Sequence, residues 1–520
     1  MAKALVSSLL RPSFLYLAGI IFIAVGLSLS KPLISMGQGV LGLAWILEGN
    51  HKEKIIAFFK NSIAWALISY YVLTILGLLY TSDFDFAWDD IRRKMPLFVI
   101  PFVLFSKTFS YKELKLVFSI FIGGVLLSSF WSIFVKLGGL GIEITDVRDL
   151  SRFNSHIRFG LEICLAIFLG FFYINKSSSL KEKIVWVLII LWLIIFMVLI
   201  SLMTGLVVFM ISTFLLFIFN LNRISSSFLK FSSIIFLLVI TSIAGYKFYS
   251  QYHLFFQEVE SLPLKDFTPN GSRYFHSLER TGKENGFYVW RNLSQKELEA
   301  AWEKRSTIPF RGKDHKGQPL STTLTRFISS KGEYKDRIAV EKLTNTEIKA
   351  IENGIANVRF LEISSIDKRL YDLFWELENY YSGGDYNGHS LIMRLEYWKT
   401  GIDIFKNNWL LGVGTGDIQN VYYEQYKENN SLLKPQFQLR AHNQYITAMA
   451  TFGMIGLIIF LFFIAYPIIQ TKAQNSFIYL GFFIVLIISM ITEDTLDTQV
   501  GISFFVFFNT LLLYHKKELT

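Results

Sequence analysis

Long apolar stretches separated by short polar ones occupy most of the chain. A helix that crosses a bilayer needs roughly 17–25 predominantly apolar residues. About twelve stretches approach that length, so the pattern predicts an all-α polytopic membrane protein. The predicted transmembrane helices lie at 13–30, 32–47, 62–81, 95–106, 114–136, 157–174, 184–200, 203–220, 229–249, 442–469, 476–492 and 499–515. The second and fourth of these are short or weakly apolar, and we expect them to be tilted, re-entrant or partly interfacial.

One long hydrophilic segment interrupts this pattern between the ninth and tenth predicted helices. The predicted division of the chain is nine helices at 1–249, a loop domain at 250–440 and three helices at 441–520. The hydrophilic segment is too long for a connection without structure of its own. Two capping boxes, Ser294 with Glu297 and Thr344 with Glu347, each predict the start of a helix within it. We therefore expect a mainly helical domain.

The distribution of lysine and arginine among the short loops gives an orientation. With the N-terminus inside, most of these residues fall in the inner loops, whereas the outer loops hold fewer of them and several acids. We therefore expect both termini in the cytoplasm and the 250–440 domain on the outer side. The cluster Arg92–Lys94 is an exception, because it falls in an outer loop.

Composition agrees with a membrane protein. Of the 520 residues, 52% are hydrophobic and 18% are charged, whereas soluble domains are nearer a quarter charged. A disordered chain and a single soluble globule are therefore excluded. In a membrane protein, a net charge of +10 reflects how lysine and arginine are distributed among the loops. We therefore expect no nucleic-acid partner. The single cysteine, Cys164, excludes an internal disulfide and indicates a small buried side chain.

Two of the eight histidines stand where an outer loop enters a predicted membrane helix. His156 lies two residues before Arg158, and His442 lies two residues after Arg440. An ionisable group at such a mouth is costly to desolvate, so both histidines are functional candidates. The alternative is a polar side chain that reaches for the membrane interface. No paired-histidine spacing occurs, and we expect neither a metal nor another cofactor.

The glycine-rich stretch Gly412–Asp417 resembles a loop that binds phosphate. It lacks the Gly-Lys-Ser/Thr sequence of a P-loop and the strand–helix context of a dinucleotide-binding loop. A tight turn is therefore the favoured interpretation.

Arg394 and a late acidic cluster are further candidates. Helical spacing puts Arg394 on one face with Trp398, where the guanidinium either stacks on the indole ring or grips phosphate through two N–H groups. The last outer loop holds acids that either pair with such arginines or are solvated: Glu493, Asp494 and Asp497.

The residues around His442 resemble the signature of the O-antigen ligase and O-antigen polymerase superfamily. That signature is carried here by His442-Asn443, a spacer of nine residues, and Gly453-Met454-Ile455-Gly456-Leu457. Upstream, Arg394 and Asn408–Asp417 are similar to the stretch that precedes this histidine in the family, and Thr492–Gly501 is similar to its final outer loop. The layout of helices also matches. Residues 270–380 look like an insertion.

The resemblance implies a membrane glycosyltransferase. Such an enzyme moves a glycan from an undecaprenyl-pyrophosphate carrier to an acceptor hydroxyl, lipid A–core in the ligases, on the periplasmic face of the bacterial inner membrane. It implies His442 as general base and Arg394 as pyrophosphate ligand. The chemistry of a pyrophosphate leaving group and a histidine base predicts direct displacement with inversion at the anomeric carbon, and it requires no metal. Residues expected to contact the carrier are Arg158, Arg440, His156 and Asn443, and residues expected to support the site are Gly414, Asp417 and Glu493.

One position departs from the family pattern. Met203 stands where an arginine is expected, so either Arg158 or Arg440 supplies that charge or the phosphate clamp is impaired. The main alternative function is an O-antigen polymerase that extends lipid-linked repeat units. A transporter or flippase is less favoured, because no inverted repeat is visible and the candidate charges gather at one face. A non-catalytic scaffold is a third alternative.

Overall fold

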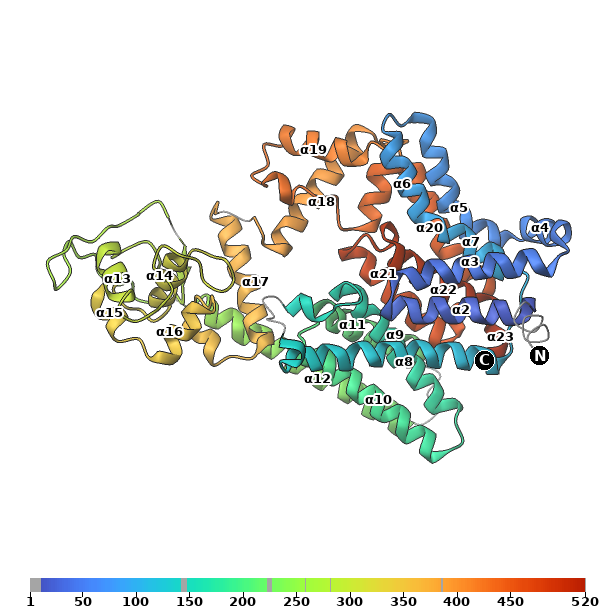
Figure 1. The fold of residues 1–520 in the computed structure, drawn as a ribbon, viewed down its shortest axis with the longest axis horizontal. Coiled ribbons are helices and arrows are strands. Elements are labelled where there is room, and N and C mark those ends of the chain that lie inside the picture. The colour runs from blue at the N-terminus through green and yellow to red at the C-terminus, as the bar shows by residue number, and fades with distance from the viewer. Residues whose placement is uncertain are drawn as a thin grey trace. The chain divides into compact units, whose positions relative to one another are not determined.

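The computed structural model describes residues 11–141, 147–221, 227–257, 259–280, 282–384 and 387–519. The chain forms two compact units (Figure 1). Unit 1 consists of residues 1–225 and 393–520, and unit 2 consists of residues 226–392.

Unit 1 contains helices from both ends of the chain. The helices of its N-terminal part are α2 (Pro12–Leu29), α3 (Lys31–Glu48), α4 (His51–Lys60), α5 (Ser62–Leu76), α6 (Phe84–Lys94), α7 (Pro96–Leu104), α8 (Tyr111–Lys136), α9 (His156–Lys176), α10 (Leu180–Leu199) and α11 (Met203–Asn220). The C-terminal part holds most of α18 (Ser390–Asn407), then α19 (Ile418–Glu428), α20 (Gln444–Thr471), α21 (Phe477–Thr492), α22 (Gln499–Tyr514) and α23 (Lys516–Leu519).

Among the described helices, seven are long and apolar enough to cross a membrane. They are α2, α5 with the turn that follows it to Tyr80, α8, α9, α10, α11 and α20. Helices α21 and α22 are apolar but shorter, with 16 residues each. Helix α7 has nine residues, which rise roughly 14 Å, about half of a hydrocarbon core. The protein is therefore a mainly helical multi-pass membrane protein, and the predicted count of twelve spans is not confirmed.

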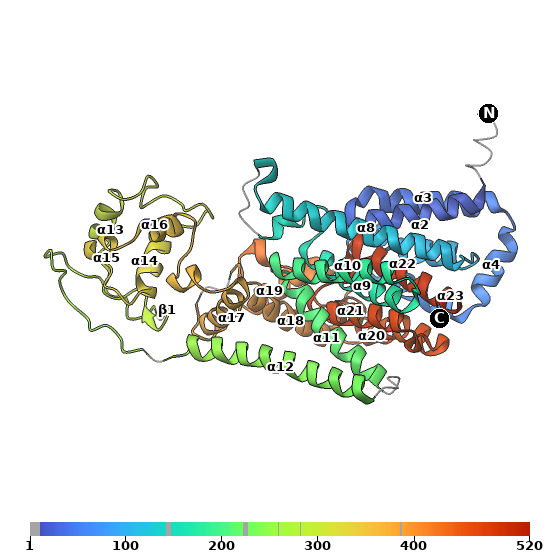
Figure 2. The same ribbon diagram turned by 90° about the horizontal axis from the view of Figure 1, so that it is seen from below.

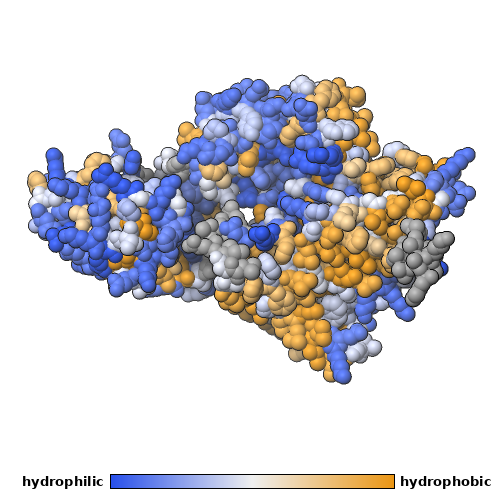
Figure 3. Space-filling view, in the orientation of Figure 1, coloured by the Kyte–Doolittle hydropathy of each residue, from blue (hydrophilic) through white to orange (hydrophobic). Residues whose placement is uncertain are grey.

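The surface of unit 1 agrees with a membrane setting. Hydrophobic residues gather over α8 and α10, whereas hydrophilic residues cover α18 and α19 (Figure 3). Leu188, Leu191 and Ile195 on α10 are about half exposed. Large apolar side chains that face outward along a whole helix are expected where lipid is the solvent.

The two ends of the chain pack against each other inside unit 1. Helix α5 packs on α20, α7 packs on α22, and α9 contacts α10, α11 and α21 (Figure 1). Helices α9 and α11 approach closely at Gly160 and Gly205, because a Cβ added to Gly160 would lie 2.9 Å from the Cα of Gly205. Small residues at such a crossing allow the dispersion contacts that hold membrane helices together.

Helix α20 is broken in the middle of its apolar sequence. Gly453 has φ +66°, outside the helical region. The break leaves backbone groups without partners in the helix, and the loop after α18 supplies them. The four hydrogen bonds run from Met454 N to Trp409 O (2.8 Å), Ile455 N to Leu410 O (3.4 Å), Val413 N to Ala450 O (3.2 Å) and Gly414 N to Thr451 O (2.9 Å). Irregular backbone at membrane depth is tolerated where protein satisfies it in this way.

In its described residues, unit 2 contains one helix of 29 residues and a small mixed domain. Its helices are α12 (Ser227–Phe255), α13 (Gln295–Trp302), α14 (Leu320–Ser330), α15 (Arg337–Glu341), α16 (Asn345–Glu352) and α17 (Ser365–Tyr381). A two-residue strand pair, Lys283–Glu284 with Phe287–Tyr288, forms an antiparallel hairpin. Helix α17 packs on α12 (Figure 2), where the rings of Phe255 and Tyr371 meet edge to face.

The two predicted capping boxes have different outcomes. Thr344 and Glu347 form a complete capping box at the start of α16, as predicted. Ser294 does begin α13, but its side chain makes no capping hydrogen bond. The capping box predicted there is wrong, because the carboxylate of Glu297 accepts hydrogen bonds from Thr268 and Asn270 instead. A tertiary contact has replaced the local one.

The substitution Gly453→Ala tests the helix break. The new Cβ would collide with the carbonyl group of Leu410, and the left-handed conformation alone costs about 1–2 kcal/mol for a residue other than glycine. We expect a lower thermal unfolding temperature for the purified protein in detergent. Gly123→Ala in α8 is the matched control, because a Cβ there meets nothing in the described chain within 4 Å. Equal unfolding temperatures for the two variants would contradict this account of α20.

Candidate functional site

The loop between α21 and α22 contacts residues 440–442, which lie just before α20. Three carboxylates of this loop contact residues 440–442. Their partners are His442 Nδ1, 3.6 Å from Glu493 Oε2; the His442 N–H, 3.1 Å from Asp494 Oδ2; and Arg440 Nη1, 2.7 Å from Asp497 Oδ2. The acidic loop therefore contacts the segment around His442 at three successive points. Of the two alternatives for these acids, ion pairing with arginines or exposure to solvent, the structure shows ion pairing for Glu493 and Asp497.

His442 adopts an unusual backbone conformation at the mouth of α20. Its φ is +47°, in the left-handed region that a residue other than glycine seldom adopts. The hydrogen bond from its N–H to Asp494 holds this conformation in place. The imidazole is 34% exposed, and its ring centroid lies 5.7 Å from that of Tyr397. Within the described chain Nδ1 of the ring makes no hydrogen bond, and the partly exposed ring is open to a substrate group.

Asn443 supports the start of α20. Its side-chain oxygen accepts hydrogen bonds from the N–H groups of Tyr445 (3.0 Å) and Ile446 (3.2 Å). This is the arrangement of an N-cap residue, which satisfies backbone donors that the first helical turn leaves open. The structure therefore gives Asn443 a defined role in positioning the residue next to it, His442.

Glu493 joins His442 to Arg394. Arg394, near the start of α18, donates from Nη2 to Glu493 Oε1 (3.0 Å) and from Nε to the carbonyl oxygen of Thr492 (3.2 Å). Burial by itself would raise the pKa of Glu493, but His442 and Arg394 outweigh it and lower this pKa below the usual value. The carboxylate is therefore charged at neutral pH, and it lies between the guanidinium of Arg394 and the imidazole of His442.

A buried ionic network lies behind the imidazole. Lys94 Nζ is 2.7 Å from Asp90 Oδ2 and 3.4 Å from Asp497 Oδ1, and all three side chains are at most 4% exposed. Burial would raise the pKa of Asp497, but Lys94 and Arg440 lower it to about 2. Asp497 is therefore a permanent anion between two cations, one from α6 and one from the segment before α20.

Asp494 is the third carboxylate, and its environment differs. It accepts a 2.6 Å hydrogen bond from Thr447 Oγ1 besides the one from the His442 N–H. Burial and the neighbouring charge of Asp497 raise the pKa of Asp494 above its usual value. Its contacts fix the backbone of the segment rather than a cation.

The N-terminus of α9 contributes the other predicted cation. Arg158 Nη1 donates to Ser155 Oγ (3.1 Å), while its Nε is buried without a hydrogen-bond partner in the described chain. Arg158 also interacts electrostatically with Glu493. His156 Nδ1 lies 3.0 Å from Ser151 Oγ, in the loop before α9. The structure thus connects Arg158 with the Glu493 cluster, whereas the described contact of His156 is local.

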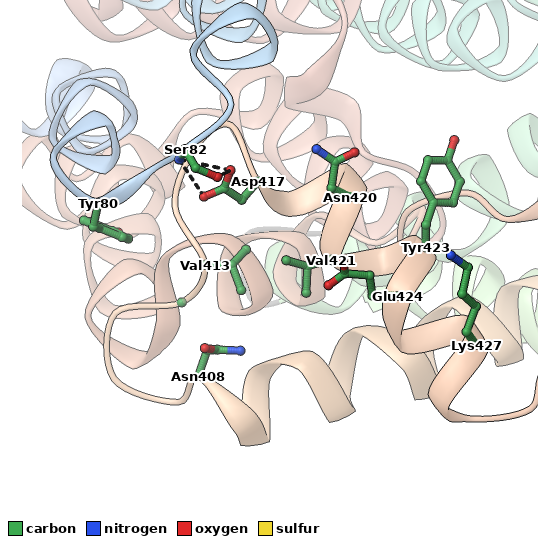
Figure 4. Close-up of a pocket in the computed structure, with 11 residues that line it drawn as sticks. Tyr80, Ser82, Asn408, Val413, Asp417, Asn420, Val421, Tyr423, Glu424 and Lys427 are labelled. Carbon is green, nitrogen blue, oxygen red and sulfur yellow. Dashed lines mark hydrogen bonds between the residues drawn. The ribbon is translucent and has the colours of Figure 1, made fainter.

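Backbone N–H groups of the glycine-rich stretch donate hydrogen bonds to other parts of the protein. The N–H groups of Val413 and Gly414 complete the broken α20, and the Gly416 N–H donates to Thr81 Oγ1 (2.8 Å). Asp417 accepts hydrogen bonds from the backbone N–H and the hydroxyl of Ser82 (Figure 4). The tight turn is therefore the role that the geometry supports, and these amides do not form a phosphate cradle.

Met203 occupies the position that departs from the predicted arginine pattern. It begins α11, two residues before Gly205, which packs against Gly160 of α9. Its place is therefore beside the α9–α11 crossing, on the same helix pair that carries Arg158.

Sequence reasoning missed two members of this network, Lys94 and Asp90. The signal for Lys94 was its presence in Arg92–Lys94, the basic cluster that departs from the predicted orientation. The structure explains that exception, because acids neutralise Lys94 in the interior of the protein. Tyr397 beside His442 gave no separate signal in the sequence.

The family of O-antigen ligases matches residues 353–461. This range includes Arg394, the glycine-rich stretch, His442 and the break in α20, and it excludes the acidic loop at 493–497. The match supports assignment of the chain to the O-antigen ligase-like superfamily. No curated protein matches the chain.

The substitution Asp497→Asn tests the buried network. Lys94, which is buried, and Arg440, which is 17% exposed, would lose their shared anion; breaking a buried pair costs about 3–5 kcal/mol. We expect earlier thermal unfolding, followed with a thiol-reactive dye that labels Cys164, the only cysteine, which is buried in α9.

Asp89→Asn is the matched control for this substitution. Asp89 pairs with Arg92, but both side chains are more than half exposed, and surface pairs contribute about 0–1 kcal/mol. The role of Asp497 would be refuted if both variants unfolded at the temperature of the unmodified protein.

Proposed function

We propose that the protein is a glycosyltransferase of the O-antigen ligase type. It transfers a glycan from an undecaprenyl-pyrophosphate carrier to a hydroxyl of an acceptor glycolipid, lipid A–core, on the periplasmic face of the bacterial inner membrane. The family match and the contact between His442 and Glu493 support this proposal. The single observation that carries it is a partly exposed imidazole 3.6 Å from a carboxylate that also forms an ion pair with Arg394.

His442 serves as the general base. Its Nδ1 faces the Glu493 carboxylate, so the neutral ring carries its proton on Nδ1 and keeps the lone pair of Nε2 for the acceptor hydroxyl. As the hydroxyl oxygen attacks the anomeric carbon, its proton passes to Nε2. Glu493 then stabilises the imidazolium, as an acid does in catalytic triads.

The bond to the pyrophosphate breaks as the new glycosidic bond forms, and direct displacement inverts the anomeric carbon. The leaving group gains negative charge, which preorganised cations stabilise. Arg394 and Arg158 are the cations best placed for this task. Arg394 has five N–H donors and can bind phosphate while it keeps Glu493, and Arg158 has an unpartnered Nε within the described chain.

Arg440 has a different part in the proposal. Its guanidinium is paired with Asp497 at 2.7 Å and lies over the ring of Phe86, 5.8 Å from the centroid. These contacts hold the segment that carries His442, so we assign Arg440 to positioning rather than to the pyrophosphate. His156 and Asn443 flank the proposed carrier site from α9 and α20.

The substitution His442→Ala tests the assignment of the base. Purified protein in detergent is mixed with lipid-linked donor and acceptor, and product is measured directly, since a carrier protein would form none. We expect the transfer rate to fall by about 10²–10⁴-fold, the usual contribution of a general base. His315→Ala is the control, because His315 is exposed in unit 2. Transfer at the normal rate by His442→Ala would remove it from the mechanism.

A gene deletion distinguishes a ligase from a polymerase. If the protein is a ligase, cells without it accumulate finished polymer on the carrier and attach none to lipid A–core. Single repeat units on lipid A–core would identify a polymerase instead.

The substitution Glu493→Gln tests whether this carboxylate positions the base. The shape of the side chain is kept, but the charge that orients His442 is lost. We expect kcat to fall at least roughly tenfold, the loss seen when the partner that orients a metal-bound histidine is removed. The KM for the acceptor and the unfolding temperature are expected to stay close to those of the unmodified protein, whereas the KM for the donor is expected to change because Arg394 loses its ion pair. A change in unfolding temperature with unaltered kcat would assign Glu493 a purely structural role.

A further inference from the structure

A pocket of about 760 Å³ opens in unit 1 beside the glycine-rich turn (Figure 4). Its volume lies within the range of ligand sites, about 300–1,000 Å³. The lining residues come from the turn before α6, the loop after α18 and the length of α19. The six with polar side chains used in the argument are Tyr80, Asn408, Asn420, Tyr423, Glu424 and Lys427.

The pocket walls are held in place by hydrogen bonds. The hydroxyl of Tyr80 donates to the carbonyl oxygen of Leu411 (2.9 Å), and Asn420 Nδ2 donates to Asp83 Oδ2 (3.1 Å). Asp417 joins the turn before α6 to α19 through Ser82, as Figure 4 shows. A preformed wall binds a ligand without a large cost in ordering side chains.

The chemistry of the lining favours a saccharide. Tyr80 and Tyr423 line the pocket and are 38% and 39% exposed, and an aromatic ring supplies an apolar surface on which the C–H groups of a sugar can pack. The amides of Asn408 and Asn420 and the carboxylate of Glu424 offer donors and acceptors to its hydroxyl groups.

Two other ligand classes fit the pocket less well. An acyl chain would bury these polar groups without partners, at a cost for each of them. The charged lining residues are Asp417, Glu424 and Lys427. They leave one net negative charge, which disfavours a phosphate group.

The pocket shares its supporting elements with the proposed catalytic site. Helix α18 carries Arg394 near its start and leads to Asn408 in the pocket. The turn at Ser82 leads into α6, which ends at Lys94 in the buried network. A sugar chain held in the pocket would therefore be positioned by the same elements that position the cations and the base.

We propose that this pocket is a saccharide subsite that binds sugar units of one of the two glycan substrates at a distance from the reacting bond. This inference rests on the proposed function, because the substrates are those of the transfer reaction. Tyr423 and Asn420 act in binding the sugar chain and take no part in the chemical step.

The substitution Tyr423→Ala tests the subsite with the full-length protein in detergent. We expect the KM for one glycan substrate to rise about five- to tenfold, the loss of one good contact. We expect kcat to stay within about twofold. Separate titrations of lipid-linked donor and of lipid A–core acceptor show which substrate occupies the pocket. Tyr381→Ala is the control, because Tyr381 is exposed on α17 in unit 2. Unchanged KM values for both substrates would overturn the proposal.

A binding experiment separates this inference from the proposed function. The probes are core oligosaccharide and O-polysaccharide fragments, released from their lipids by mild acid. Saturation-transfer NMR is expected to detect one of them with the unmodified protein and with His442→Ala, and to lose it with Tyr423→Ala. Glu424→Gln is a second, milder variant that is expected to weaken the same signal if Tyr423→Ala fails to fold.

The outcomes of the two experiments differ. Transfer without binding of either probe would overturn the subsite and leave the proposed function standing. Probe binding that depends on Tyr423, in a protein that transfers no glycan, would support a saccharide site and refute the proposed function.

Discussion

The contact between the acidic loop at 493–497 and the segment at 440–447 is the constraint on which the arrangement of this protein depends. Each of the three carboxylates in the loop meets a different group of that segment: an imidazole, a backbone N–H and a guanidinium. Gln444 adds a fourth contact, because its Oε1 accepts a hydrogen bond from the Leu496 N–H (2.7 Å). Charges so poorly solvated are stable only when each has its partner, and this requirement fixes where His442 lies.

The same constraint connects distant parts of the chain. Lys94 arrives from α6, Arg394 from α18, and Asp497 from the loop between the last two apolar helices. Lys94 and Arg440 share Asp497, so the anchor of α6 and the anchor of the His442 segment are one carboxylate. The site is therefore assembled from several helices and loops rather than from one of them. Ionic contacts and hydrogen bonds are stronger in a poorly hydrated interior than in water, so they can hold these parts together.

The break in α20 allows the glycine-rich turn to pack against this helix. A continuous helix would keep its own backbone hydrogen bonds, whereas the break at Gly453 directs them to the turn at 409–414. The same turn forms one wall of the pocket, whose other walls are the turn before α6 and helix α19. Glycine is required at Gly453 because the backbone there is left-handed and a carbonyl group of the neighbouring turn leaves no space for a Cβ. The glycine-rich stretch is thus a complement to the helix break.

The sequence by itself determined that the protein is a mainly helical membrane protein. It also determined the helices with strong apolar patterns and the residues around His442 that resemble a known family. It also located the start of α16 at Thr344, because a capping box is a local interaction. Only the tertiary structure decided that Glu493 bridges His442 and Arg394, that Lys94 belongs to a buried network, and that Glu297 serves Thr268 rather than its own helix. Apolar periodicity and capping act between residues close in the chain and can be read along it. Ion pairs form between residues up to several hundred positions apart, and a charge in the sequence does not say which partner will neutralise it.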